Sequence, residues 1–414
     1  MTQSRFDLEQ AWAGNVPSRW RWSRNKELLA ESLCVSLDGT EELLSVSHLT
    51  GITPKSEKNV TMTEAESLDG YRLVSTGDLV INTMWAWMGA LGVSKQAGIV
   101  SPAYGVYNPR PDMPFHPGFY DYLYRSNPYV MEMTRRSRGI WSSRLRLYPD
   151  VFLSMAVPVP PLEEQRAIAD YLDHETARID TLIDEQQRLI EMLRERRQAI
   201  IDGAFSELGE PCVQLRRYTR FLTSGSRGWG DYYADEGERF VRIGNLPRAN
   251  LDLRGDIQFV DLPADVTEGS RTMLEAGDLL FSITAYLGSV AVVGGDWVGA
   301  YVSQHVALCR LESQNADPRF IGWFMLTTTG QDQLNEGAAG GAKMQLALDD
   351  IRGLRVPLVP IDDQRSIASS LDDRTAKIDV LIAESERFIE LARERRSALI
   401  TEAVTGQIDV RKAA

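Results

Sequence analysis

One internal duplication constrains the fold of this 414-residue chain more than any other feature. Val157-Pro158 recurs 199 positions later as Val356-Pro357, and Gln165-Arg166 recurs at the same offset as Gln364-Arg365. The match continues without a gap to Arg194-Glu195-Arg196-Arg197, which recurs as Arg393-Glu394-Arg395-Arg396. Self-similarity at a fixed offset is the signature of a repeat architecture. The chain therefore consists of two related halves.

Each copy of the repeated segment predicts one long helix, over residues 160–206 and 357–410. Prolines stand at the start of each copy and are followed by a stretch of about 40 residues without Gly or Pro, as expected of a helix that begins after proline. At about 1.5 Å per residue, each helix would be roughly 60 Å long.

Apolar residues follow 4-3 spacing along both helices, which predicts an antiparallel coiled coil. The predicted seam residues, which would contact the other helix or a partner protein, are Ile168, Leu172, Ile179, Leu182, Leu189 and Leu193, then Ile367, Leu371, Ile378, Leu381, Phe388 and Leu399. Two such helices in one chain most simply pack on each other. The tandem duplication then predicts an internal pseudo-twofold axis.

The segments before the two helices are weaker copies of one another. Gly77–Asn82 aligns with Gly277–Ser282, and both patterns are strand-like. Short β runs at 73–82, 241–243, 278–283 and 290–293 are separated by turn residues, and helical stretches at 119–124 and 318–327 come late in each half. We predict two mixed α/β domains, at residues 1–159 and 207–356, separated by the long helices.

Composition narrows the class of protein. With 43% apolar residues the chain can bury a core in each domain, which excludes a disordered or collagen-like protein. The net charge of -13 gives no overall basic footprint, so a role with nucleic acid has to rest on local charge. Three dispersed cysteines, no apolar leader and no run near the roughly 18 residues that span a bilayer predict a soluble, cytoplasmic protein without a zinc site.

Catalytic motifs are weak throughout the chain. The nearest match to the N/D-P-P-Y/F motif of amino-methyltransferases is Ser126-Asn127-Pro128-Tyr129, which is one proline short. The segment Gly337–Met344 resembles a Walker loop only loosely, because Ala342 replaces the glycine before the lysine. The four histidines form no HExxH motif or nucleophile pair. We therefore expect no catalytic residue and no metal ligand.

The residues at the start of each long helix resemble the specificity subunits of type I restriction-modification enzymes. The most specific parts are Pro160-Pro161-Leu162-Glu163-Glu164-Gln165-Arg166 and its second copy, Pro360-Ile361-Asp362-Asp363-Gln364-Arg365. The segment 77–104 is similar to the family's target recognition domains, and 403–409 looks like its C-terminus. The second copy departs from the family pattern conservatively, with Asp362-Asp363 where Glu-Glu is more usual.

The resemblance implies a subunit without catalytic activity that carries two target recognition domains. Each domain would recognise one half of a split, asymmetric DNA sequence, and the helices would set the spacing between the halves. The helices would also dock two methyltransferase subunits, to which ATP-dependent restriction and translocase subunits can add. The chain itself would bind no cofactor, because S-adenosylmethionine, ATP and Mg²⁺ belong to those partner subunits.

Candidate DNA-binding residues lie at equivalent places in the two halves. The segment 135–146 holds five arginines and no acidic residue, and the Gly-rich segment around Lys343 occupies the same place in the second half. Arginine and lysine there can contact phosphates or the major-groove edge of guanine. The complete set is Arg135, Arg136, Arg138, Arg144, Arg146, Ser101, Tyr104, Arg227, Ser303, Gln304, His305, Lys343 and Gln345.

Other interpretations of these patterns remain open at this stage. Trp85 and Trp87 alternate on a strand-like run, which favours packing in a core or against the helices over contact with a base. The repeated Arg-Glu-Arg-Arg motifs favour solvated or inter-helix ion pairs. A coiled-coil scaffold that binds no DNA is the alternative function, and a self-sufficient methyltransferase is a third.

Overall fold

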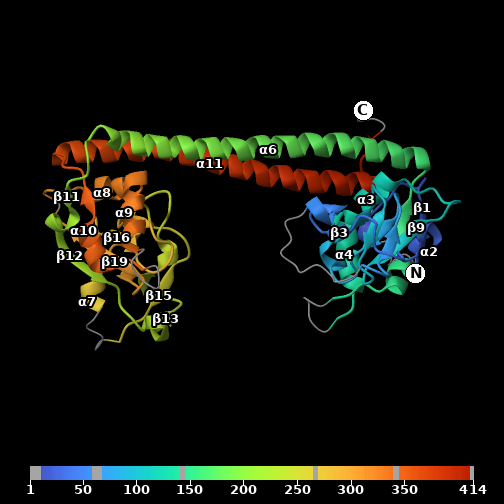
Figure 1. Ribbon diagram of the computed structural model, residues 1–414, viewed down its shortest axis with the longest axis horizontal. Coiled ribbons are helices and arrows are strands. Elements are labelled where there is room, and N and C mark those ends of the chain that lie inside the picture. Colours follow the sequence, from blue (N-terminus) through green and yellow to red (C-terminus); the bar gives the residue numbers. More distant parts are fainter. Residues whose placement is uncertain are drawn as a thin grey trace. The chain divides into compact units, whose positions relative to one another are not determined.

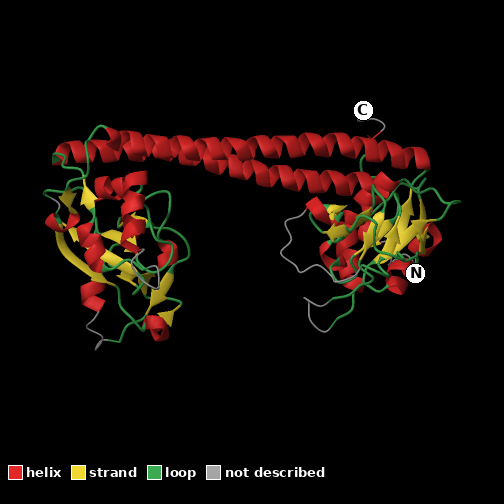
Figure 2. Ribbon diagram, viewed as in Figure 1, coloured by secondary structure: helices red, strands yellow, loops and turns green. Residues whose placement is uncertain are grey.

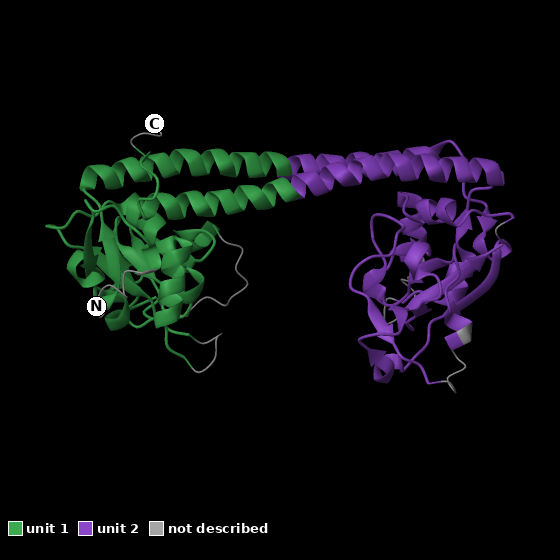
Figure 3. Ribbon diagram, turned by 180° about the vertical axis from the view of Figure 1, so that it is seen from behind, with its two compact units in different colours: residues 1–186, 387–414 green, residues 187–386 purple. Residues whose placement is uncertain are grey.

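The computed structural model describes residues 11–57, 68–139, 145–263, 269–312, 314–338 and 345–410. The chain divides into two compact units (Figure 3). Unit 1 comprises residues 1–186 with 387–414, and unit 2 comprises residues 187–386. Figure 2 shows helices and strands mixed within the α/β domain of each unit.

Unit 1 is built on a four-stranded antiparallel sheet in the order β2-β9-β6-β7, beside the strand pairs β1-β10, β3-β4 and β5-β8 (Figure 1). Its strands are β1 (Arg21–Arg24), β2 (Leu29–Glu31), β3 (Leu44–Ser47), β4 (Gly51–Pro54), β5 (Arg72–Val74), β6 (Leu79–Ile81), β7 (Leu91–Val93), β8 (Gly98–Val100), β9 (Gly105–Pro109) and β10 (Ala156–Val159). Its helices are α2 (Asn25–Leu28), α3 (Pro117–Arg125), α4 (Asn127–Arg136) and α5 (Pro149–Ser154).

Unit 2 has an equivalent sheet in the order β12-β19-β16-β17, a second sheet in the order β13-β15-β14-β18 and the pair β11-β20. Its strands are β11 (Val213–Gln214), β12 (Thr219–Ser224), β13 (Tyr233–Ala234), β14 (Glu238–Val241), β15 (Gln258–Val260), β16 (Leu279–Ser282), β17 (Val290–Val292), β18 (Tyr301–Val302), β19 (Val306–Leu311) and β20 (Arg355–Val356). Its short helices are α7 (Gly269–Thr272), α8 (Pro318–Met325), α9 (Thr328–Ala338) and α10 (Leu348–Gly353).

The main sheets of the two units start from the same Gly-Asp turn. Gly77 and Gly277 have φ of 93° and 84°, a left-handed conformation that glycine adopts without a Cβ penalty. The Asp78 carboxylate accepts a hydrogen bond from the Ser75 backbone N–H at 2.7 Å, and Asp278 accepts one from Glu275 at the same distance. This turn corrects the single strand predicted at 73–82, because it separates β5 from β6.

A buried glutamine fixes the start of each long helix. The side-chain carbonyl of Gln165 accepts a hydrogen bond from the His116 backbone N–H at 2.8 Å, and its amide donates to the carbonyls of Pro114 and Pro160. Gln364 makes the equivalent contact with the Asp317 N–H at 2.8 Å. Both glutamines are at most 1% exposed. Their identity in the two copies therefore has a structural cause, since a buried amide needs all its partners.

The two predicted long helices are confirmed as α6 (Leu162–Ser206) and α11 (Ile361–Val404). In unit 2, Arg197 pairs with Asp379 at 2.7 Å and Arg194 with Glu386 at 3.1 Å, so α11 runs antiparallel to α6. Unit 1 repeats the first pair through the duplicated residues, as Arg396 with Asp180 at 2.9 Å. The Arg-Glu-Arg-Arg motifs thus form inter-helix ion pairs, as expected, and the predicted fold class of mixed α/β domains with two long helices is confirmed.

Four of the predicted seam residues do not pack in the seam between the helices. The side chains of Leu182, Leu189, Leu381 and Phe388 are 36–48% exposed. Buried isoleucines are instead spaced by eleven residues at 168, 179, 190 and 201 in α6 and at 378 and 389 in α11, and Ile183 is buried between two of them. Eleven residues in three turns is 3.67 per turn, close to the natural helix, whereas the heptad pattern requires 3.5. The 4-3 pattern therefore drifts off the buried face along helices of this length.

The eleven-residue seam predicts unequal effects for adjacent apolar residues. Ile190 is 5% exposed and Leu189 is 36% exposed. We expect Ile190→Ala to lower the free energy of unfolding by about 2–4 kcal/mol, because it leaves a cavity between helices. Leu189→Ala should cost less than about 1 kcal/mol. Urea denaturation of the full chain measures both, and equal losses would contradict this seam.

Candidate nucleic-acid interface

Three separate segments of unit 1 meet at Thr83, in the β6–β7 turn (residues 82–90). The Thr83 hydroxyl donates a hydrogen bond to the Ala103 carbonyl at 3.0 Å. The Thr83 carbonyl accepts one from the Leu147 backbone N–H at 2.9 Å, and the Arg146 Nε lies 3.4 Å from the Thr83 hydroxyl. The fold thus brings the predicted residues near 101–104 and near 146 to the same turn.

Two predicted arginines lie opposite each other on this surface. The backbones of Arg138 and Arg146 form an isolated antiparallel bridge, with hydrogen bonds of 3.0 Å and 2.9 Å. Both residues are exposed, and the Arg146 guanidinium lies 6.0 Å from the ring centre of Tyr148. The bridge fixes the two ends of the segment between them and presents two positive charges to solvent. Arg144, also predicted, lies outside the described residues.

Arg135 and Arg136, at the end of α4, share the carboxylate of Glu132. Arg135 donates to both Glu132 oxygens, at 2.7 Å and 2.8 Å, and Arg136 donates to one of them. The Glu132 side chain is only 6% exposed. Burial alone would raise the pKa of Glu132, but hydrogen bonds from the two arginines outweigh it and hold the pKa below its ordinary value of 4.5. The carboxylate therefore stays ionised and orients both arginines.

Ser101 and Tyr104 form a turn beside the arginine pair. The Tyr104 backbone N–H donates to the Ser101 carbonyl at 3.0 Å, and both residues are half-buried. Burial, together with the neighbouring Tyr71, raises the pKa of the Tyr104 hydroxyl. The hydroxyl is therefore neutral at physiological pH, so it can donate as well as accept a hydrogen bond.

Unit 2 builds the same junction at its β16–β17 turn (residues 283–289). The Ile283 backbone N–H donates to the His305 carbonyl at 3.1 Å, and the Ile283 carbonyl accepts from the Leu346 N–H at 3.0 Å. Leu346 is the duplicate of Leu147, so both units attach the segment before their last short helix to the hairpin turn. Gln345 is exposed beside this contact. Lys343 lies outside the described residues.

His305 is the most accessible of the candidates in the turn after β18. Its Nδ1 lies 2.9 Å from the Thr284 hydroxyl, and its Nε2 lies 3.1 Å from the Gln304 side-chain amide. Ser303 differs from the prediction, because it is 4% exposed and its hydroxyl is buried without a hydrogen-bond partner. Its backbone N–H instead donates to the Val241 carbonyl at 3.0 Å. Ser303 therefore supports the sheet from below the surface.

The backbone of Ser226 places the adjacent Arg227 on the same surface. The Ser226 backbone N–H donates to the Val302 carbonyl at 3.0 Å, which places the exposed Arg227 next to the turn that carries His305. Trp229, two residues later, is 3% exposed and packs against Phe240 and Tyr301. The tryptophan anchors this loop in a core, and the arginine faces solvent.

The sequence prediction for the tryptophan pair is wrong for Trp85. Its side chain is 49% exposed, and it precedes a 3-10 helix (Ala86–Met88) rather than lying on a strand. Trp87 is half-buried and stacks on Trp85 with ring centres 6.1 Å apart. The equivalent turn of unit 2 exposes Tyr286, which was not predicted. The sequence feature that could have identified Tyr286 is its position shortly after Gly277-Asp278, since Trp85 lies in a similar position after Gly77-Asp78.

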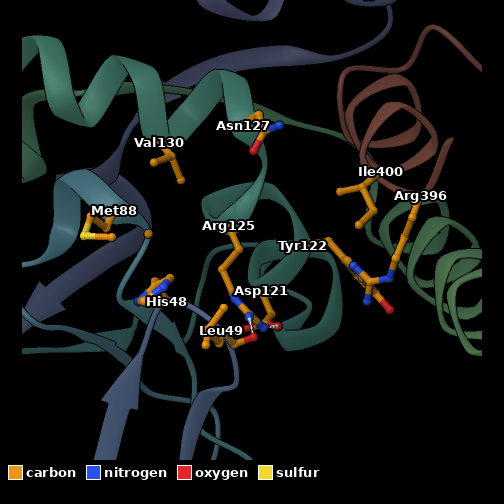
Figure 4. A pocket seen from close by; sticks show the side chains of 11 residues that line it. His48, Leu49, Met88, Asp121, Tyr122, Arg125, Asn127, Val130, Arg396 and Ile400 are labelled. Carbon is orange, nitrogen blue, oxygen red and sulfur yellow. Dashed lines mark hydrogen bonds and ion pairs between the residues drawn. The ribbon is translucent and has the colours of Figure 1, made fainter. Parts of the chain in front are cut away.

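A cavity of about 300 Å³ lies behind the β6–β7 turn of unit 1. Figure 4 shows Met88 from the turn, Asn127 and Val130 from α4, and Arg396 and Ile400 from α11 around it. Two further lining groups have structural partners. The Tyr122 hydroxyl donates to Asp173 at 2.8 Å, and Asp121 accepts from the Val93 backbone N–H at 2.8 Å. These contacts hold the sheet and α6 in place. The residues around the cavity therefore support the turn and do not form a catalytic arrangement.

No group of three or more His, Cys, Asp and Glu side chains among the described residues is placed to hold a metal ion. No helix in the described ranges is both long and apolar enough to cross a membrane.

Comparisons with known proteins agree with the resemblance drawn from the sequence. Residues 265–387 match the family described as type I restriction modification DNA specificity domain. The EcoKI specificity subunit of Escherichia coli K12 is 23% identical over 319 residues, which are 72% of this chain and 67% of that protein. The EcoBI specificity subunit of E. coli is 21% identical over 61% of this chain and 58% of its own length. The alignments thus span about two thirds of these relatives or less.

Two solved structures share the fold over nearly the whole chain. A chain from work on complex assembly and conformational transition of the type I R-M system aligns with a TM-score of 0.70, covering 95% of this chain and 100% of that one. The HsdS subunit from Thermoanaerobacter tengcongensis aligns with a TM-score of 0.55, covering 95% and 98%. Each is 16% identical in sequence, so these two matches concern the fold.

The shared carboxylate of Glu132 predicts a pH-dependent contribution to stability. Because its pKa is lower in the folded chain than in the unfolded chain, the contribution is complete above pH 4.5 and is lost as pH falls through the folded pKa. We expect Glu132→Gln to cost about 1–3 kcal/mol at pH 7. Urea denaturation from pH 7 to 3 should show this difference shrinking, with the exposed Glu57→Gln as control. A difference that does not change with pH would contradict the assignment.

Proposed function

As a relative of the specificity subunits of type I restriction-modification systems, this chain is, we propose, the subunit that selects the DNA target of such an enzyme. Each unit carries one surface for DNA. In unit 1 the surface consists of the β6–β7 turn, the turn at 101–104 and the arginines at 138 and 146. In unit 2 it consists of the β16–β17 turn, His305, Arg227 and Gln345.

The main support for this proposal is that both units form equivalent backbone contacts at this surface but expose different side chains on it. The backbone contacts are equivalent, as the bonds from Leu147 to Thr83 and from Leu346 to Ile283 illustrate. The exposed groups differ, with Arg138 and Arg146 in unit 1 and Arg227, His305 and Gln345 in unit 2. Base edges are distinguished by their donors and acceptors. Two surfaces with different donors and acceptors would recognise two different half-sites, which makes the target bipartite and asymmetric.

The long helices would set the spacing between the two half-sites. Both are continuous, without Gly or Pro from 162 to 202 in α6 and from 361 to 404 in α11. Their antiparallel packing is fixed by duplicated ion pairs in each unit. A stiff pair of helices would therefore keep the number of base pairs between half-sites constant, as in other proteins that bind two half-sites on one duplex.

The apolar side chains that the helix seam leaves exposed would dock the methyltransferase subunits. Unit 1 exposes Leu182, Phe388 and Leu391, and unit 2 exposes Leu189, Met192 and Leu381, each between 36% and 58%. The duplication relates these two sets residue by residue. Two equivalent apolar surfaces favour two copies of one partner. Apolar side chains exposed in this way are typical of interaction sites.

The chemistry would be carried out by the partner subunits. We propose that S-adenosylmethionine, ATP and Mg²⁺ bind to the methyltransferase and restriction subunits and that this chain positions them on DNA in the cytoplasm. The weakness of the candidate motifs at 126–129 and 337–344 supports this division of labour. The acidic net charge of -13 supports it as well, because the partners would then supply much of the phosphate neutralisation.

DNA binding by the assembled complex tests the proposed function. We expect binding to one sequence with an affinity about 10³-fold or more above that for random duplex, and a steep decrease as salt rises. Arg146→Ala should weaken binding by about 1–3 kcal/mol if the side chain contacts a base. Fluorescence anisotropy measures both, with the exposed Arg188→Ala on α6 as control. Binding without sequence selectivity would favour the coiled-coil scaffold instead.

Variants of the exposed apolar side chains test the docking surfaces. We expect the double variant Leu189→Ser, Phe388→Ser to weaken association with the methyltransferase by about 30-fold or more, because buried apolar residues dominate interface energy. Glu191→Ala, on another exposed face of α6, is the matched control. Analytical ultracentrifugation of the mixed subunits measures the change. Unchanged association of the double variant would place the docking surface elsewhere.

A further inference from the structure

Each unit presents one aromatic ring to solvent at the same point of its hairpin turn. Trp85 is 49% exposed in the β6–β7 turn, and Tyr286 is 56% exposed in the β16–β17 turn. The backbone N–H of the residue just before the second strand donates a hydrogen bond to the carbonyl of each ring's residue, Ala90 to Trp85 at 3.2 Å and Ser289 to Tyr286 at 3.1 Å. The two turns differ in length, yet both place a ring at this point.

Two hydrogen bonds and one pair of stacked rings fix the turn that carries Trp85. The Trp87 indole N–H donates to the Met84 carbonyl at 3.0 Å, and the Thr134 hydroxyl of α4 donates to the Trp87 carbonyl at 3.0 Å. The rings of Trp85 and Trp87 lie nearly parallel, 17° apart. The Trp85 ring is therefore exposed to solvent, while the turn that carries it is held in place by hydrogen bonds.

Tyr286 is held in a strained conformation. Its φ of 50° is the one positive φ at a residue other than glycine among the described residues. The Ser282 hydroxyl donates to the Tyr286 carbonyl at 2.6 Å, and Gln331 of α9 donates to the Gly288 carbonyl at 2.9 Å. A bulky residue with positive φ costs free energy and persists where the surroundings fix it, often at functional sites.

In unit 2 an arginine lies over the ring itself, and in unit 1 an arginine contacts the turn that carries the ring. The Arg248 guanidinium lies over the Tyr286 ring, 4.7 Å from its centre. In unit 1, Arg146 contacts Thr83, two residues before Trp85. An exposed aromatic ring beside an arginine offers a base a flat apolar face and offers the adjacent phosphate a cation. The contact between ring and arginine is present in unit 2, whereas in unit 1 the arginine and the ring belong to the same turn.

We propose that Trp85 and Tyr286 each stack on a base that is unstacked at one half-site, Trp85 at the half-site bound by unit 1 and Tyr286 at that bound by unit 2. The inference rests on the proposed function and extends it. Enzymes that modify a base take it out of the helix, and an inserted apolar side chain can hold such a step open. Because every base has an aromatic face, these rings would contribute affinity and DNA opening rather than base identity.

The test uses the full chain in its complex with the methyltransferase, and duplexes of the recognised sequence with 2-aminopurine at successive positions. We expect Trp85→Ala to change the fluorescence at a position in one half-site and Tyr286→Ala at a position in the other. Each variant should bind the duplex about 5- to 150-fold more weakly, which corresponds to about 1–3 kcal/mol for one stacked base. Each variant serves as the control for the other half-site.

Further variants separate stacking from folding and from DNA recognition itself. Trp85→Phe and Tyr286→Phe keep a ring and should retain most of the wild-type signal, whereas Tyr233→Ala removes a ring of β13 that is 45% exposed and should have no effect. Wild-type fluorescence and affinity in Trp85→Ala and Tyr286→Ala would overturn the stacking proposal and leave the proposed function intact. Failure of the wild-type complex to bind any sequence selectively would instead overturn the proposed function.

Discussion

The packing of α6 against α11 is the constraint on which the rest of the molecule depends. Isoleucines spaced by eleven residues lie on the buried face of each helix, a spacing close to the natural helical period. The ends of both helices are also part of the domain cores, since Leu172 and Ala403 lie in the core of unit 1 and Phe205 and Leu371 in that of unit 2. The buried glutamines then fix where each helix leaves its domain. The core of each unit therefore anchors the ends of both helices and the proposed DNA-binding surface of that unit.

Duplication explains how one chain can hold two related but unequal surfaces. What the two units share is backbone and support: the Gly-Asp turn, the glutamine at the helix start and the contact between the hairpin turn and the last short helix. What differs is exposed: unit 1 has Trp85 and Arg146 at this surface, and unit 2 has Tyr286 and His305 in the equivalent part. Buried support changes slowly because each change costs packing energy, whereas exposed side chains are nearly free to vary.

The sequence alone was sufficient for the architecture but insufficient for the details of the surfaces. Gap-free repetition and proline-delimited helices predicted α6, α11 and the paired α/β domains correctly. The 4-3 spacing wrongly placed Leu189 and Phe388 in the seam. Apolar residues on both sides of the seam fit a heptad pattern, and only their burial in the structure shows which of them pack between the helices. The alternation of Trp85 and Trp87 wrongly predicted a strand, because over three residues a 3-10 helix and the end of a strand have similar sequence patterns. The contact of Arg248 with Tyr286 joins residues 38 positions apart and has no local signal.

Base-modification sequencing of the host genome, with and without the gene for this chain, tests the central claim most directly. We expect deletion to abolish modification at one split, asymmetric motif with a constant number of unspecified base pairs between its halves. Restoring the gene should restore the same motif. An unchanged pattern of modification in cells that express both this chain and its methyltransferase partner would contradict DNA target selection by the two units.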